Sequence, residues 1–182
     1  MKRNEFLKST CTFGICGCMG LSFLNSGEIF AGSKSSNAAD EPDWRIDFMR
    51  SRYHDLINIL NNTLDRETFI PILHQLGSKC GEGFAKDFKN NPQGFFTFIK
   101  GKWVETVDYD EANGIIKVNE KVRNDCNCPL VKGKEAPDVL CNCSIGTQKK
   151  IYESLFGRQV DVKLEKSILR GDERCSFTIK LI

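Results

Sequence analysis

Two pairs of closely spaced cysteines are the residues of this sequence best suited to chemistry. The stretch DCNCPLVKGKEAPDVLCNCSIG contains Cys126 and Cys128 and, after a loop with proline and glycine, Cys141 and Cys143. In an extended chain, residues i and i+2 point the same way, so each pair is expected to present both sulfurs together. Four such sulfurs suit a metal site, with zinc favoured over an iron–sulfur cluster. They also suit two crosswise disulfides or redox-active thiols, and the residues leave these alternatives open.

Two further cysteines are candidates for the same chemistry. Cys175 alternates with Phe177 and Ile179 in a period-two run, which predicts an inward-facing thiol on the last strand. Cys80 lies between glycines in the stretch GSKCGEG and is a candidate nucleophile or additional ligand. No neighbouring His–Asp signature supports the role of nucleophile.

The other three cysteines lie in residues 1–32, which have the character of an export segment. A basic start precedes an apolar stretch and then small residues suited to cleavage. The string RNEFLK is similar to the twin-arginine export motif, with Asn4 in place of the second arginine. We expect export to the periplasm or cell envelope, with membrane attachment only through this segment. The alternative is a cytoplasmic protein in which these residues form the first helix. Residues 33–43 are typical of a soluble linker.

Length and composition predict one globular domain over residues 44–182. The chain has 182 residues, of which 40% are hydrophobic and 27% charged, enough to bury a core without a disulfide or metal staple. The net charge of +2 is spread along the chain, and no basic stripe of the kind that neutralises phosphates is present. We therefore expect no nucleic-acid partner.

Hydrophobic periodicity predicts three helices in the first part of the domain. Two amphipathic segments cover residues 43–64 and 65–88, the second with Asp65 as N-cap and a break near Gly77. A third, short helix rich in phenylalanine opens at Asn91-Pro92. The apolar stripes of the first two helices are Met49, Tyr53, Leu56, Ile57 and Leu60, followed by Phe69, Ile72, Leu73 and Leu76.

From residue 103 the period changes to two, which predicts strands. Two alternating runs meet at Asn113-Gly114, a strong hairpin signal. An amphipathic helix then runs from a cap at Ser144 to Gly157, and two more strands follow, joined around Gly171-Asp172. This order of elements predicts an α+β domain in which helices pack around an antiparallel sheet.

The last forty residues have a layout that resembles the 4-vinyl reductase family of small-molecule-binding domains, including the sensory domains of aromatic-responsive bacterial regulators. The resemblance is carried by a Cys-Ser-x-Gly helix start at Cys143, the helix end LFG, a strand with Glu165, and GDERCSF leading the final strand. The same tail is similar to the L-2-amino-thiazoline-4-carboxylic acid hydrolase family. The first resemblance implies an antiparallel sheet wrapped by helices around an apolar ligand cavity. Candidates for the lining of such a cavity are Phe95, Phe96, Phe98, Trp103 and Tyr109.

The metal-containing members that this tail resembles imply a set of zinc ligands. Carried over by position, these are Cys143 at the helix start, Glu165 on the strand and Cys175 after the Gly-Asp turn. A further family cysteine is expected near Ile168, where this sequence has none, so Cys141, Cys128 or Cys126 is left to complete the set.

These observations favour an exported small-molecule-binding domain with a structural, cysteine-ligated zinc site. The alternative is a hydrolase of the thiazoline-carboxylate type, in which a thiol or an open metal position acts on a C=N or C–N bond. A thiol redox protein is the second alternative. Whether the protein is an enzyme is left open by the sequence.

Overall fold

The computed structural model describes residues 44–131 and 136–182. The predicted export segment, residues 1–32, and the linker, residues 33–43, lie outside the described residues, as do residues 132–135. In the part that is described, no helix is both long and apolar enough to cross a membrane.

The described residues alternate between helices and short antiparallel strands in the order that the sequence predicts. The elements are α1 (Trp44–Thr63), α2 (Arg66–Asp87), α3 (Pro92–Lys100), β1 (Val104–Asp110), β2 (Ile115–Glu120), α4 (Cys141–Phe156), β3 (Val160–Lys166) and β4 (Ser176–Leu181), with short 3-10 turns at Asp138–Leu140 and Ile168–Arg170. The predicted caps are confirmed at α2 and α3, where the side chains of Asp65 and Asn91 accept hydrogen bonds from the helix-opening amides of Thr68 and Gly94.

The four strands form one antiparallel sheet in the order β1-β2-β4-β3. Gly114 makes the predicted hairpin turn with φ +64°, a backbone conformation that favours glycine. In β4, Phe177 pairs with Val118 of β2 on one side and Leu164 of β3 on the other. These three side chains share the face of the sheet that the helices cover, so the inward alternation predicted for the last strand is confirmed.

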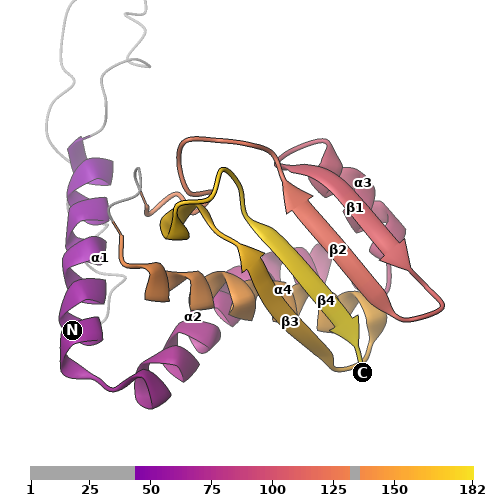
Figure 1. Cartoon of the computed structure of the whole chain (residues 1–182), viewed down its shortest axis with the longest axis horizontal. Coiled ribbons are helices and arrows are strands. Elements are labelled where there is room, and N and C mark those ends of the chain that lie inside the picture. Colours follow the sequence, from indigo (N-terminus) through magenta and orange to yellow (C-terminus); the bar gives the residue numbers. More distant parts are fainter. Residues whose placement is uncertain (1–43, 132–135) are drawn as a thin grey trace, which may run out of the picture. The chain divides into compact units, whose positions relative to one another are not determined.

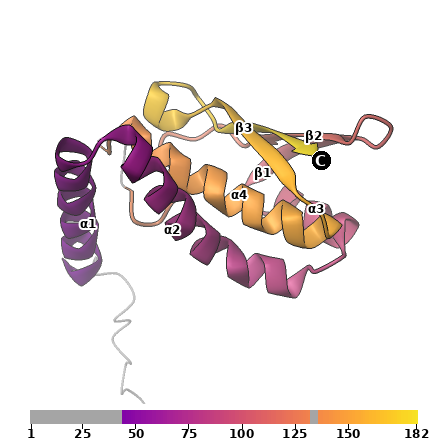
Figure 2. The same ribbon diagram turned by 90° about the horizontal axis from the view of Figure 1, so that it is seen from below.

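Helix α4 lies next to the sheet, and α2 packs along α4 (Figures 1 and 2). The predicted α+β class is confirmed. The main core lies between the sheet and these helices, and its largest fully buried side chains include Tyr152, Phe95, Ile116 and Ile179. This two-layer arrangement places the inner faces of β2 and β4 opposite α4.

The predicted break near Gly77 is wrong, because α2 continues to Asp87. A Cβ atom at Gly77 would collide with the backbone oxygen of Cys143 and lie 2.8 Å from the amide nitrogen of Thr147. The Thr147 hydroxyl donates to the carbonyl oxygen of Gly77 at 3.0 Å. Glycine therefore serves at this position to bring two helix backbones together rather than to end a helix.

The apolar stripe predicted for the first helix is correct only in part. Tyr53, Ile57 and Leu60 pack into a second, smaller cluster with α2 and the 126–143 region. Met49 and Leu56 are more than half exposed. The predicted stripe includes too many residues, since α1 meets the rest of the domain along a narrow contact only (Figure 2).

The start of α4 also differs from the prediction. The helix begins at Cys141, directly after a 3-10 turn, and not at a Ser144 cap. Its end at Gly157, with φ +65°, is as predicted. As a consequence, both Cys141 and Cys143 lie in the first turn of a helix.

Candidate functional site

A cavity of about 350 Å³ lies under the sheet, between β2, β4 and the helices. Its volume falls in the range of ordinary small-molecule pockets. The apolar part of its lining is Phe84, Phe95, Ile99, Trp103, Val104, Val118, Pro129, Ile151 and Phe177. The remaining lining residues are Cys80, Glu120, Cys126, Asn127, Cys128, Cys143, Ser144, Thr147, Gln148 and Cys175. We call this space the main cavity.

The periodicity of the sequence explains why these side chains meet. On β2, Val118 and Glu120 are two residues apart and so share the inward face. On α2, Cys80 and Phe84 are four residues apart and lie one above the other on the same face. On α4, Ser144, Gln148 and Ile151 follow the same helical spacing, so each element contributes one stripe to the wall. Trp103, which follows the end of α3, completes the wall.

Aromatic rings form one side of the main cavity. The centroid of the Phe84 ring lies 5.6 Å from that of Trp103 and 6.5 Å from that of Phe95, both in edge-to-face arrangements. Such pairs are favourable and hold each ring in a defined orientation. Two of the five predicted pocket aromatics, Phe95 and Trp103, are therefore in the lining, and Phe84 and Phe177 were missed.

The other three predicted pocket aromatics belong to the core and not to the cavity wall. Phe96 packs 6.2 Å from Tyr109 and 6.4 Å from Tyr152, measured between ring centroids. Phe98 packs against Phe88 at 5.2 Å. Phe96 is one position from Phe95 on α3 and so faces another way. Phe98 shares the Phe95 face of α3 and also contacts Phe84, but it does not line the main cavity.

Glu120 is the one acidic side chain in the wall of the main cavity, and sequence reasoning missed it. It is only 5% exposed, and its Oε2 atom has no hydrogen-bond partner among the described residues. Burial raises its pKa to about 7, although the positive charge of Arg123 acts in the opposite direction. The signal was present in the sequence, because Glu120 continues the inward alternation of Ile116 and Val118.

A second, much smaller cavity of about 30 Å³ lies beside the first and is walled by sulfur. All five cysteines predicted for the metal site line it: Cys126, Cys128, Cys141, Cys143 and Cys175. Cys80 lines the main cavity together with four of them. The structure thus brings the six cysteines of the described residues to one region, and all six are free thiols.

The two Cys-x-Cys pairs do not present their sulfurs in the way that an extended chain would. Cys141 and Cys143 lie in a helix, where residues two apart point about 200° away from each other. Cys141 turns to the main core, where its Sγ lies 2.9 Å from the hydroxyl oxygen of Ser167. Cys143 packs against the smaller cluster instead. Cys126 and Cys128 lie in an irregular loop, so the strand geometry expected for them is also wrong.

Burial raises the pKa of each of the five thiols that line the smaller cavity. The largest effects bring Cys143 to about 12 and Cys175 to about 11, with neighbouring thiols adding to the effect in both cases. These side chains are therefore protonated at neutral pH and are poor nucleophiles as they stand. A metal ion would have to displace their protons.

Cysteine sulfurs are chemically suitable zinc ligands, but these cysteines are not arranged around one common point as a zinc ion would require. Within residues 44–131 and 136–182, no group of three or more His, Cys, Asp or Glu side chains is placed to hold an ion. Helical placement of the second pair explains this, because Cys141 and Cys143 diverge.

Glu165 does not lie with the thiols, contrary to the ligand set implied by the resemblance. It is on the outer face of β3, where its carboxylate forms an ion pair with Lys163 at 2.9 Å. Leu164, its neighbour, is the residue that faces the small cavity. The strand period therefore puts Glu165 on the opposite side of the sheet from Cys175.

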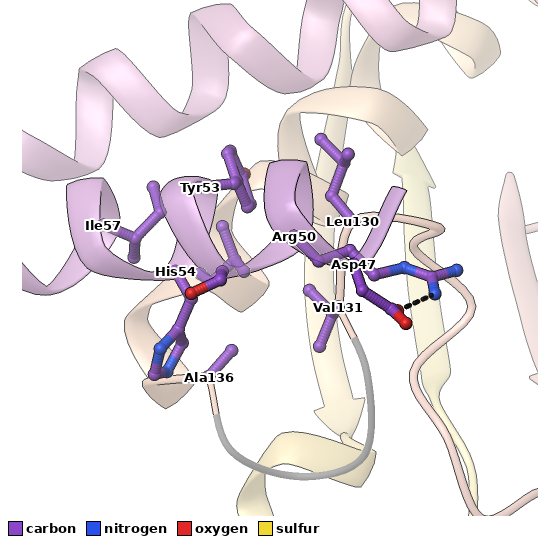
Figure 3. A pocket seen from close by; sticks show the side chains of 10 residues that line it. Asp47, Arg50, Tyr53, His54, Ile57, Leu130, Val131 and Ala136 are labelled. Carbon is purple, nitrogen blue, oxygen red and sulfur yellow. Dashed lines mark hydrogen bonds and ion pairs between the residues drawn. The ribbon is translucent and has the colours of Figure 1, made fainter. Parts of the chain in front are cut away.

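A third cavity, of about 310 Å³, lies between α1 and the chain around Leu130 (Figure 3). Its polar groups are largely satisfied or solvated: Asp47 and Arg50 form an ion pair at 3.2 Å and both remain partly exposed. The lining includes Val131 and Ala136, which flank residues that the structure does not describe. We therefore place the candidate site in the main cavity.

Comparison with known proteins agrees with the fold and leaves the activity open. A model for a family of unknown function, DUF6144, matches residues 28–182. No curated protein matches the sequence. A trafficking protein particle complex subunit 3 from Naegleria fowleri, covalently bound to palmitic acid, has a TM-score of 0.50 and 14% identity, covering 78% of this chain and 97% of its own. That likeness shows a shared fold.

Two more solved structures are similar at lower scores. The phenol-responsive sensory domain of the transcription activator PoxR, with phenol, has a TM-score of 0.45 and 17% identity, covering 72% of this chain and 74% of its own. A vinyl-4-reductase family protein from Methanocaldococcus jannaschii has a TM-score of 0.37 and 15% identity, covering 80% of this chain and 98% of its own.

Proposed function

This chain belongs to DUF6144, a family of unknown function, and we propose that it is a binding domain for small, mainly apolar molecules. The observation that carries the proposal is the main cavity of about 350 Å³, whose wall combines four aromatic rings with a single buried carboxyl group. A largely apolar wall with few polar groups is the usual form of a small-molecule site, since apolar area gives affinity and the polar groups give orientation.

Two further points support this function. The trafficking subunit from Naegleria fowleri, which shares the fold, holds palmitic acid, so an apolar guest is compatible with this architecture. The wall of the main cavity contains no histidine, so none of its thiols has an imidazole base beside it within the described lining. Binding is therefore better supported than hydrolysis by a cysteine nucleophile.

Tryptophan fluorescence tests the proposal directly, because the chain has only two tryptophans. Trp103 lines the main cavity, whereas Trp44 is 69% exposed on α1. In the full-length variant Trp44→Phe, small aromatic molecules such as 2-phenylethanol should change the emission of Trp103 in a saturable way. The matched variant carries Val118→Phe in addition, which fills the cavity from β2 and should weaken binding at least tenfold. Emission that does not change, or changes equally in both variants, would count against a ligand site in the main cavity.

We also propose that the sulfur-lined cavity holds a structural zinc ion. Its volume of about 30 Å³ leaves room for one water-sized guest and none for an organic ligand, and five thiols are part of its wall. Zinc would join the 126–128 loop to α4 and β4, and its role would be to hold these elements together. The candidate ligands are Cys126, Cys128, Cys143 and Cys175, with Cys141 engaged by Ser167.

Elemental analysis and thiol counting test the zinc proposal. Protein purified without oxygen should contain about one zinc per chain, and added chelator should make three or four more thiols reactive in the folded protein. Metal-free protein with every thiol equally reactive before and after added zinc would contradict the site. Matching disulfides found by mass spectrometry would point to the crosswise pairing instead.

A further inference from the structure

Glu120 is a buried carboxyl group whose hydrogen-bonding capacity the described residues do not use in full. It is 5% exposed, faces the main cavity, and leaves its Oε2 atom without a hydrogen-bond partner among the described residues. A buried carboxylate oxygen without a donor is unfavourable, and native proteins retain few such groups. Its backbone is well held, since the Glu120 amide donates to the carbonyl oxygen of Cys175 at 2.9 Å. The side chain is therefore fixed at the wall with an unused acceptor.

The protein itself offers Glu120 one nearby cation, Arg123, but does not pair the two. Arg123 directs one of its guanidinium nitrogens to the side-chain oxygen of Asn127 at 2.7 Å. Its Nε atom is buried without a partner, and Arg123 is not part of the cavity wall. Glu120 thus lines the cavity with a carboxyl group that Arg123 does not pair.

The rest of the wall is suited to an organic cation. Aromatic faces attract cations through their negative charge density, and Phe84, Phe95, Trp103 and Phe177 are part of the cavity wall. The remaining polar wall residues carry amides, hydroxyls or thiols. Of these, the Thr147 hydroxyl is already used in a bond to Gly77. Among the described wall residues, Glu120 is the one acidic side chain, and none is Lys, Arg or His.

The geometry points to Glu120 as the anchor for a ligand that combines an apolar, ring-sized body with a protonated amine. The ammonium group would donate to the carboxylate of Glu120, and the apolar body would lie among the aromatic rings. This inference rests on the proposed ligand-binding function and names its ligand class. It also explains why an acid is kept at a position where the strand period calls for an apolar residue.

Three probes of matched shape test the inference: 2-phenylethylamine, the neutral 2-phenylethanol and the anionic phenylacetate. Affinities are measured with the full-length protein by Trp103 emission in the Trp44→Phe background and by calorimetry. The amine should bind at least tenfold more tightly than the alcohol, and phenylacetate more weakly than either. Because this comparison of the three probes leaves Glu120 unchanged, it remains informative even if a Glu120 variant folds poorly.

Two charge-removing variants complete the experiment. Glu120→Gln keeps the shape and should reduce the preference for the amine over the alcohol to less than threefold. Glu165→Gln removes the same charge from the outer face of the sheet and should leave the preference unchanged. An alcohol that binds as well as the amine, tightest binding by phenylacetate, or an equal loss in both variants would overturn the inference while leaving the binding function intact. No binding of any probe in the unmodified cavity would overturn both.

Discussion

Cys143 and Cys80 differ in environment although both line the main cavity. Cys143 packs against Tyr53 and the smaller cluster and has its pKa raised to about 12 by burial, whereas Cys80 is exposed on α2. A thiol in an apolar setting behaves as a small hydrophobic group. Its replacement by serine would place a hydroxyl in a largely apolar, partly buried setting.

We therefore expect Cys143→Ser to destabilise the fold by about 1–3 kcal/mol, since it buries a polar group. Cys80→Ser should change the free energy of unfolding by less than about 0.5 kcal/mol, as is usual for an exposed site. Urea unfolding in the presence of chelator measures the difference. With zinc added, the gap between the two variants should widen. Equal, small effects under both conditions would remove the basis for a clustered site.

The environment of His74 on α2 predicts how the stability of the fold depends on pH. Burial lowers its pKa below 6.5, with the charge of Lys149 as a smaller cause, and its Nε2 atom has no partner among the described residues. A lowered histidine pKa means that the unfolded chain binds a proton more readily, so stability should fall as pH drops through 6.5. Thermal melts from pH 7.5 to 5 should show a smaller loss in His74→Gln than in the parent. An identical pH profile in both proteins would show that His74 does not contribute.

The pairing of α2 with α4 is the element-level feature that positions the site. Gly77 of α2 lies against the backbone of Cys143, and Gly146 of α4 lies against the backbone of His74. Two hydroxyl bonds cross the same interface, from Thr147 to Gly77 and from Ser154 to Ala85, at 3.0 and 2.8 Å. The close approach of these helices sets where Cys80 and Cys143 meet the cavity.

Gly77→Ala should therefore cost about 1–3 kcal/mol or more, because its Cβ would have to push the two helix backbones apart. Gly83 provides the control in the same helix, since a Cβ there meets nothing within 4 Å. Gly83→Ala should instead stabilise the protein by about 0.5–1 kcal/mol through its better helix propensity. Guanidinium unfolding of both variants gives the comparison. A Gly77→Ala protein as stable as Gly83→Ala would contradict the packing described for α2 and α4.

The elements and their order could be predicted from the sequence, because they follow from local periodicity and turn chemistry. Asp65, Asn91, Gly114 and Gly157 act as the caps and turns that their residue types indicate. The role predicted for Gly77 is wrong because a single sequence does not distinguish a glycine that ends a helix from one that allows a second helix to pack closely.

The site was predictable only in part. The inward direction of Cys175 follows from the alternation of the last strand, and the resemblance implied that Cys175 meets the Cys-x-Cys segment. In the structure these five cysteines line one small cavity. Their orientation could not be foreseen, because it depends on α4 starting at Cys141. Which rings of α3 face the cavity depends on tertiary packing, so Phe96 and Phe98 were assigned wrongly. The zinc ion itself stays a prediction.

At the scale of the whole molecule, the described domain combines a cavity partly lined by aromatic rings with an apolar outer surface on α1. Trp44, Phe48, Met49 and Ile59 are each more than half exposed there. An apolar probe has more than one place to bind, and only binding in the main cavity supports the proposed function. A direct test must therefore report the position of the ligand as well as its affinity.

Intermolecular nuclear Overhauser effects between 2-phenylethylamine and the full-length protein give that position. We predict contacts from the probe's ring to Trp103, Phe84 and the methyl groups of Val118, and from its methylene next to nitrogen to Glu120. Contacts confined to Trp44 and its neighbours on α1, or none at saturating probe, would contradict the account.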